Sequence, residues 1–148
     1  MNNTEQHRTI MSRNLSFVNL VEMIDAEKLS SSIFIPGVGV YLSTPLTFRK
    51  LESIGLASLE FTDKIENKNR IVFQKLTLSV CERFEVGNHK FCFLVTTVSG
   101  KQYIIGGKDR PYPIITFTDS RPDNAASKCA VTMVVTYSNL CFYEVLGR

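Results

Sequence analysis

The chain has 148 residues, of which 44% are hydrophobic and 21% are charged, and its formal net charge is +3. A chain of this length forms one domain and buries enough surface to fold without disulfides or metal ions. These figures exclude extensive disorder, collagen-like repeats and a multidomain enzyme. The small positive charge falls short of the basic excess of a dedicated nucleic-acid-binding protein, although it allows a local basic patch.

The N-terminal sequence MNNTEQHRTIM contains no apolar segment. We therefore expect no secretory signal and predict a mobile polar tail over residues 1–14, followed by a single β-rich domain over residues 15–148. No segment reaches the ~20 apolar residues that a membrane-spanning helix needs. We expect a protein that is made in the cytoplasm and has no membrane partner.

Segment 16–29 allows two interpretations. Its apolar residues recur at helical spacing, and Ser16 is a suitable N-cap, so a short amphipathic helix is the first expectation. The residues that carry this spacing are Phe17, Leu20, Val21 and Ile24. However, Val21, Met23 and Ile24 also suit a strand that ends near Asp25. Residues 33–42 are β-branched and interrupted by Pro36 and Gly37, which is typical of an edge strand with a bulge or bend.

From residue 56 onward apolar and polar residues alternate, with turn signals about every ten residues, as in antiparallel sheets. Residues 56–64 form a predicted strand, and residues 66–69 form its turn. In segment 72–86 apolar residues occupy alternate positions, so they would lie on one face of a strand. These residues are Val72, Leu76, Leu78, Val80, Phe84 and Val86. Turns at Gly87–Asn88 and Ser99–Gly100 then predict that segment 72–86 and residues 90–98 and 101–105 form an antiparallel meander.

The remaining sequence adds a bend at Gly106 and Gly107, a short strand at 114–118, a polar loop at 119–127 and a long strand at 129–137. In that last strand one parity is apolar, with Val131, Met133, Val135 and Tyr137. We therefore predict a mainly β protein, an antiparallel β-sandwich or barrel that includes a hairpin meander and at most one short N-terminal helix.

The four cysteines do not form the pairs that zinc or redox sites require, because no two are separated by two residues. They are Cys81, Cys92, Cys129 and Cys141. Three of them lie in apolar, strand-like segments. We expect buried, reduced thiols, and a disulfide framework is the alternative.

The sequence favours no catalytic residue, metal ligand or cofactor. His7 lies in the polar tail and His89 follows a turn, so neither has a setting for pairing with a nucleophile. Gly106, Gly107 and Lys108 do not continue into a phosphate-binding loop, since Asp109 follows the lysine. The carboxylates of the 119–127 loop are best read as solvated turn residues, because Arg121 occupies a position that a calcium loop needs for a ligand. We predict that the protein is not an enzyme.

Aromatic and basic residues are interleaved along the predicted strands. A β-barrel that binds single-stranded nucleic acid uses residues of these two kinds. They are Phe73, Phe84, Phe91, Phe93 and Tyr103, with Lys64, Lys68, Arg70, Lys75, Lys90 and Lys101. Core packing explains most of these aromatics equally well, because Phe84 belongs to the apolar parity. Nucleic-acid binding is therefore kept as the alternative function.

Three residues are candidates for contacts with other proteins: Arg110, Tyr112 and Arg121. Tyrosine and arginine are enriched at protein interfaces, and the prolines on either side of Tyr112 lower the cost of ordering its loop. The competing interpretation is that Tyr112 packs on its own domain and that both arginines are solvated.

Residues 76–146 contain a strand pair closing on a Ser–Gly turn (LVTTVSGKQYIIGG), a proline-bracketed segment (PYPIITFTD), a polar loop (SRPDNAASK) and a Thr/Val strand (CAVTMVVTY). This order of features resembles small β-rich structural proteins of tailed bacteriophages and prophages, over about half of the chain. The resemblance implies a virion subunit of the tail or head–tail junction, made in the host cytoplasm. It also implies a homo-oligomeric ring that contacts neighbouring virion proteins.

Overall fold

The computed structural model describes residues 9–43, 46–66, 68–81, 83–119, 131–139 and 143–147, with side chains from residue 15 onward except at residue 66. The described chain is mainly β, with one 3₁₀ helix, η2 (Ala26–Leu29), and no α-helix. Its strands are β1 (Thr9–Asp25), β2 (Ile33–Ile35), β3 (Gly39–Tyr41), β4 (Arg49–Lys50), β5 (Ala57–Glu66), β6 (Asn69–Val80), β7 (Phe91–Thr97), β8 (Gln102–Ile105), β9 (Ile114–Asp119), β10 (Val131–Asn139) and β11 (Tyr143–Gly147).

The strands form one continuous open sheet in the order β2-β3-β11-β8-β7-β1-β5-β6-β10-β9, and β4 pairs with β1 outside this path. The described pairs are antiparallel except β3 with β11, which are parallel, so the sheet is mixed. The predicted β class is confirmed. The expectation of a wholly antiparallel sheet is wrong, and so is that of a closed barrel, because β2 and β9 lie at opposite ends of the order and do not pair with each other.

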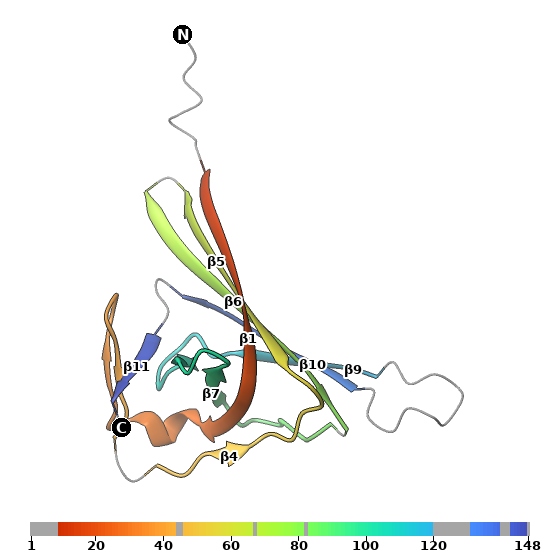
Figure 1. Ribbon diagram of the computed structural model, residues 1–148. Coiled ribbons are helices and arrows are strands. Elements are labelled where there is room, and N and C mark those ends of the chain that lie inside the picture. Colours follow the sequence, from red (N-terminus) through yellow and green to blue (C-terminus); the bar gives the residue numbers. More distant parts are fainter. Residues whose placement is uncertain are drawn as a thin grey trace.

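Strand β1 joins the two halves of the sheet. Its residues from Thr9 to Val18 pair with β5, and those from Val18 to Asp25 pair with β7. The register shifts between Val18 and Leu20, which marks a β-bulge, and bulges bend strands. Figure 1 shows β1 curving between the two halves.

Segment 16–29 is therefore strand up to Asp25 and only then η2, so the helical expectation is wrong. The physical reason is that the end of β1 is buried on both faces. Val21 and Met23 contact one core, whereas Ile24 contacts the other, and apolar residues on both faces imitate helical spacing. Residues 9–14 also belong to β1 rather than to a tail, while residues 1–8 and His7 lie outside the described residues.

Strand β7 lies between two hydrophobic cores. Phe93 and Val95 point into the first core, which they share with β1, β5, β6 and β10. Cys92 and Leu94 point into the second core, together with η2 and β3. A central strand buried on both faces reads as a continuous apolar run, which explains the sequence FCFLV.

Two predicted hairpins are confirmed, namely β5–β6 and β7–β8. The predicted meander is wrong at its first step, because β6 pairs with β5 and β10 and so has no edge left for β7. Phe84 and Val86 lie beyond the end of β6. Phe84 instead packs edge-on against Phe91 and Phe117.

The predicted faces of the long strands are confirmed. Every second residue of β10, from Val131 to Tyr137, is buried, and so are Leu76, Leu78 and Val80 of β6. The 114–118 strand is present as β9. Residues 33–42 form a tight hairpin of β2 and β3 rather than one bent strand, with Pro36 and Gly37 in its turn.

Of the two cysteines that the structure describes, Cys92 confirms the prediction of buried, reduced thiols and Cys81 does not. Cys92 is a buried free thiol that donates a hydrogen bond to the Gly107 carbonyl over 3.4 Å. Burial raises the pKa of this thiol to about 12, so it stays protonated and unreactive. Cys81 is exposed and disulfide-bonded, which corrects the expectation that it is reduced. Cys129 and Cys141 lie outside the described residues.

The bend predicted at Gly106 is confirmed. Gly106 directly follows β8 and has a φ of +102°. A Cβ atom at this position would lie 2.8 Å from Cys92 Sγ and 2.9 Å from Pro113, so neither backbone nor packing accepts a side chain. The bend brings the chain back across the sheet toward β9.

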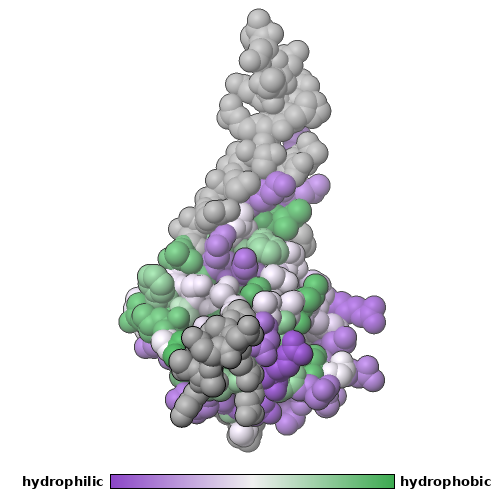
Figure 2. All heavy atoms as spheres, turned by 90° about the vertical axis from the view of Figure 1, so that its right-hand side faces the viewer, coloured by the Kyte–Doolittle hydropathy of each residue, from purple (hydrophilic) through white to green (hydrophobic). Residues whose placement is uncertain are grey.

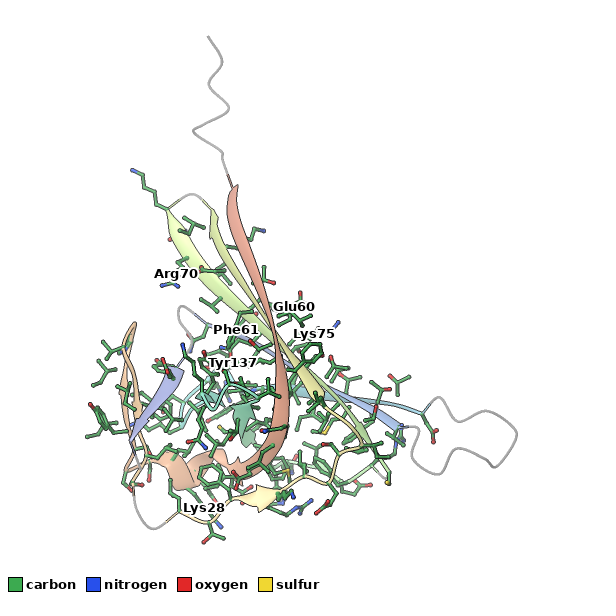
Figure 3. All side chains as sticks on the ribbon, viewed as in Figure 1. Lys28, Glu60, Phe61, Arg70, Lys75 and Tyr137 are labelled. Carbon is green, nitrogen blue, oxygen red and sulfur yellow. The ribbon has the colours of Figure 1, made fainter. Side chains whose placement is uncertain are left out.

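A three-stranded arm projects from the body of the molecule (Figure 1). We define the arm as residues 9–17 of β1, 60–66 of β5 and 69–75 of β6. Cross-strand register sorts its side chains onto two faces, since paired residues share a face. The inner face carries Phe61 and Arg70, and the outer face carries Glu60 and Lys75. Figure 3 shows these two sets on opposite sides of the strands.

Candidate functional site

An open cleft of about 630 Å³ lies between segments 86–90 and 110–115, and we call it the basic cleft. Its lining residues are Val86, Gly87, His89, Lys90, Arg110, Pro111, Tyr112, Pro113, Ile114 and Ile115. Two of these residues are permanent cations and one is a histidine, while none carries a carboxylate. Lys90 and Arg110 are both exposed. The cleft therefore combines positive charge with apolar walls.

Two of the three predicted interaction residues line this cleft. Arg110 is exposed and forms no ion pair with any described residue. Tyr112 is half-buried, and its ring packs against the second core, so part of the competing interpretation is correct. Its hydroxyl donates a hydrogen bond of 3.4 Å to the Lys108 carbonyl. Arg121 lies outside the described residues.

The opposite wall comes from His89, which the sequence suggested as a surface residue, and Lys90, which it suggested only for the alternative nucleic-acid-binding function. Lys90 Nζ lies 6.0 Å from the centre of the Tyr112 ring, a cation–π distance that links the two walls. His89 stacks on Phe91 at 5.7 Å between ring centres, and its Nδ1 lies 3.6 Å from Asp25 Oδ1. These contacts hold segment 86–90 facing Tyr112.

A smaller cleft of about 240 Å³ adjoins the first and shares His89, Lys90 and Tyr112 with it. It also includes Lys108 and the carboxylates of Asp25 and Glu27. Acidic residues line the neighbouring pockets, Asp25 and Glu27 here and Asp109 beside Arg110, whereas the lining of the larger basic cleft contains none. The basic cleft suits an anionic group, and its lining has no serine, threonine, cysteine or carboxylate that could attack a substrate.

Strand β9 starts inside the basic cleft, since Ile114 and Ile115 belong to both. It pairs with β10 along one side, and within the described part of the chain no strand pairs with its other side. The edge of β9 that no described strand covers therefore begins at the cleft. A partner strand added there would end beside Lys90 and Arg110.

Sequence reasoning found one wall of the cleft because prolines bracket Tyr112. It missed His89 and Lys90 as members of the same site, because the sequence does not say that the two loops meet. The signal that was present is the Gly87–Asn88 turn, which places both residues in a loop.

The arm is the second candidate surface. Its outer face exposes Leu15 by 61% and Phe17 by 52% on β1, and Ile71 by 44% and Phe73 by 38% on β6. Strand β5 runs between these two apolar pairs and presents Glu60 on the same face. In Figure 2, apolar side chains of the described residues lie among polar ones on the body and at the base of the arm.

Among the described residues, no three histidine, cysteine or acidic side chains lie close enough together to hold a metal ion. No described helix has the length and hydrophobicity needed to cross a bilayer. No family model, curated protein or solved structure matches the chain.

Proposed function

We propose that the protein is a non-enzymatic assembly subunit that works by oligomerising, as a component of a virion tail or head–tail junction. The observation that carries this proposal is the projecting arm with large apolar side chains on its outer face. Exposed apolar patches mark protein-binding surfaces, and the arm presents two apolar pairs on one face, with β5 between them. The virion assignment itself comes from the sequence resemblance.

The arm also offers backbone groups to a second copy. Residues from Thr9 to Ser16 of β1 pair with β5 on one side, and no described strand pairs with their other side. A long unpaired strand edge is a template for strand addition between chains. When the arm of one copy contacts a different surface of the next copy, the contact is head-to-tail, and such contacts form a ring when the rotation between successive copies closes.

The alternative function, single-stranded nucleic-acid binding by a barrel, has less support. The sheet is open, and the aromatic residues on which that reading depended are divided between different surroundings. Phe93 is in the first core, whereas Phe73 lies on the outer face of the arm. They therefore do not form one stacking platform for successive bases.

The test is the mass of the purified protein in solution, measured by mass photometry and by light scattering over a concentration series. We expect a discrete oligomer whose mass is unchanged by a labelled oligonucleotide. The double variant Leu15→Ser with Phe73→Ser should become a folded monomer that still unfolds cooperatively, because both side chains are exposed within one chain.

The matched control is Val38→Ser with Ile54→Ser, which removes two exposed apolar side chains away from the arm. It should assemble like the unmodified chain. A wild-type protein that stays monomeric at every concentration contradicts the proposed function, and assembly that survives in the arm variant removes the arm from the interface.

A further inference from the structure

The edge of β9 that no described strand covers has the features of a strand-addition site, above all at residues 114–118. It is a regular strand of six residues, and no proline or lysine interrupts it. Ile114, Thr116 and Thr118 on its outer face are exposed. Natural proteins protect edges with lysines, prolines, bulges or a covering segment, and within the described residues β9 shows none of these.

The direction of an added strand follows from the position of the cleft. Strand β9 runs away from the basic cleft, from Ile114 to Asp119. A strand that pairs antiparallel with β9 runs the opposite way, so its C-terminal end reaches Ile114 and then the cleft. A parallel strand would bring its N-terminal end, whose terminal amine is cationic, to the same place.

The positive charge of the basic cleft favours the C-terminal end of an added strand, which is anionic, over its cationic N-terminal end. Lys90 and Arg110 line it without a carboxylate, and Arg110 has its guanidinium free of ion pairs with described residues. A guanidinium binds a carboxylate through two parallel hydrogen bonds, which gives both strength and orientation. Pro111, Tyr112 and Pro113 provide apolar contacts for the atoms next to that carboxylate.

We propose that β9 and the basic cleft together bind an extended segment of a partner protein, which pairs antiparallel with β9 and places an acidic C-terminal end between Lys90 and Arg110. This inference shares one assumption with the proposed function, namely that the protein acts by binding other proteins. The surface is distinct from the arm. Backbone pairing supplies affinity, and the cleft supplies specificity for the carboxylate.

The probe is a fluorescein-labelled octapeptide of alternating threonine and valine that ends in two glutamates and a free carboxylate, followed by fluorescence anisotropy. We expect it to bind at least about tenfold more tightly than a peptide with the glutamates at the N-terminal end, and than one with lysines in their place. Added salt should weaken binding, because ion pairs carry the difference.

Two further probes separate the two halves of the site. N-methylation of alternate peptide nitrogens should abolish binding if backbone pairing with β9 is required, since it removes the donors. The variant Lys90→Ala with Arg110→Ala should lose at least about tenfold in affinity for the acidic peptide. The control Lys50→Ala with Lys101→Ala removes the same charge at exposed positions elsewhere and should bind normally.

Binding that is independent of peptide direction, or equal in the cleft variant and its control, overturns the proposal, and so does absence of binding by the acidic peptide. These outcomes are distinguishable from failure of the proposed function. The cleft variant should keep the oligomer mass of the unmodified chain, and the arm variant should keep its affinity for the peptide.

Discussion

Strand β7 and the arm are both built from β-branched and aromatic residues, yet they are stabilised differently. Both faces of β7 are buried, with Phe93 in one core and Leu94 in the other. The arm is buried on one face only near its base, where Phe61 contacts Tyr103, and its outer face exposes Leu15 and Phe73. The same residue types therefore serve folding in β7 and remain available for contacts in the arm.

The comparison teaches that the apolar side chains of β7 are buried within the chain, whereas those of the proposed interaction surface on the arm are exposed. Burying an apolar side chain contributes about 1.5–3 kcal/mol to stability. In β7 this contribution is made within the single chain, because its side chains are already buried there. In the arm most of that free energy is released only when another surface covers it. Changes in β7 should accordingly lower stability, whereas changes in the arm should alter assembly.

The largest expected effect is at the centre of the body. Phe93→Ala should destabilise the fold by about 3–5 kcal/mol, because it leaves a cavity in the first core. Phe73→Ala on the arm should cost less than about 1 kcal/mol, since this side chain is exposed. Denaturant unfolding monitored by circular dichroism measures both, and similar losses at the two positions would contradict the comparison.

A smaller loss is expected at the bend after β8. Gly106→Ala should destabilise the protein by about 1–3 kcal/mol more than Gly100→Ala. Both glycines have positive φ, +102° and +93°, but a Cβ atom meets Cys92 and Pro113 only at Gly106. Thermal unfolding of the two variants isolates the packing contribution, and equal melting temperatures would show that the neighbours move aside freely.

At the junction of arm and body the sign of the effect reverses. Gln74 is buried, and neither its amide nitrogen nor its carbonyl oxygen has a hydrogen-bond partner among the described residues. Buried polar groups without partners cost about 1–3 kcal/mol, so Gln74→Leu should stabilise the fold by about 1 kcal/mol or more. A shift of the denaturation midpoint to lower denaturant would show that Gln74 does have a partner in solution.

The smallest effect belongs to the arm's ion pair. Arg70 Nη2 lies 2.6 Å from Asp63 Oδ2, and the Arg70 hydrogen bonds lower the pKa of Asp63. A lowered folded pKa contributes stability above the unfolded value of about 3.9, and this contribution is lost as the pH falls through the folded pKa. Because the pair is partly exposed, Asp63→Asn should cost only about 0.2–1 kcal/mol at neutral pH.

The matching readout is the difference in stability between Asp63→Asn and the unmodified chain, measured by denaturant unfolding from neutral pH to pH 3. We expect this difference to shrink as the pH falls below the unfolded pKa of about 3.9, because the Asp63 carboxyl then binds a proton more readily in the unfolded chain than in the folded one. A difference that stays constant would show that the ion pair does not contribute.

Local pattern determined the β class of this protein. Alternation of apolar and polar residues in β6 and β10 specified the buried face of each strand, because side chains of a strand point to opposite faces in turn. Turn residues specified the β7–β8 hairpin, since Gly100 accepts a positive φ without strain. The prolines around Tyr112 marked one wall of the basic cleft for the same kind of local reason.

Only the tertiary structure decided which strands pair over long distances and which loops meet. Strand β7 pairs with β1 because β5 and β10 occupy both edges of β6, and no local signal records that competition. Burial of β1 on both faces also gave its end a false helical periodicity. The basic cleft arose in the same way, since Lys90 and Arg110 come together only when the bend at Gly106 returns the chain across the sheet.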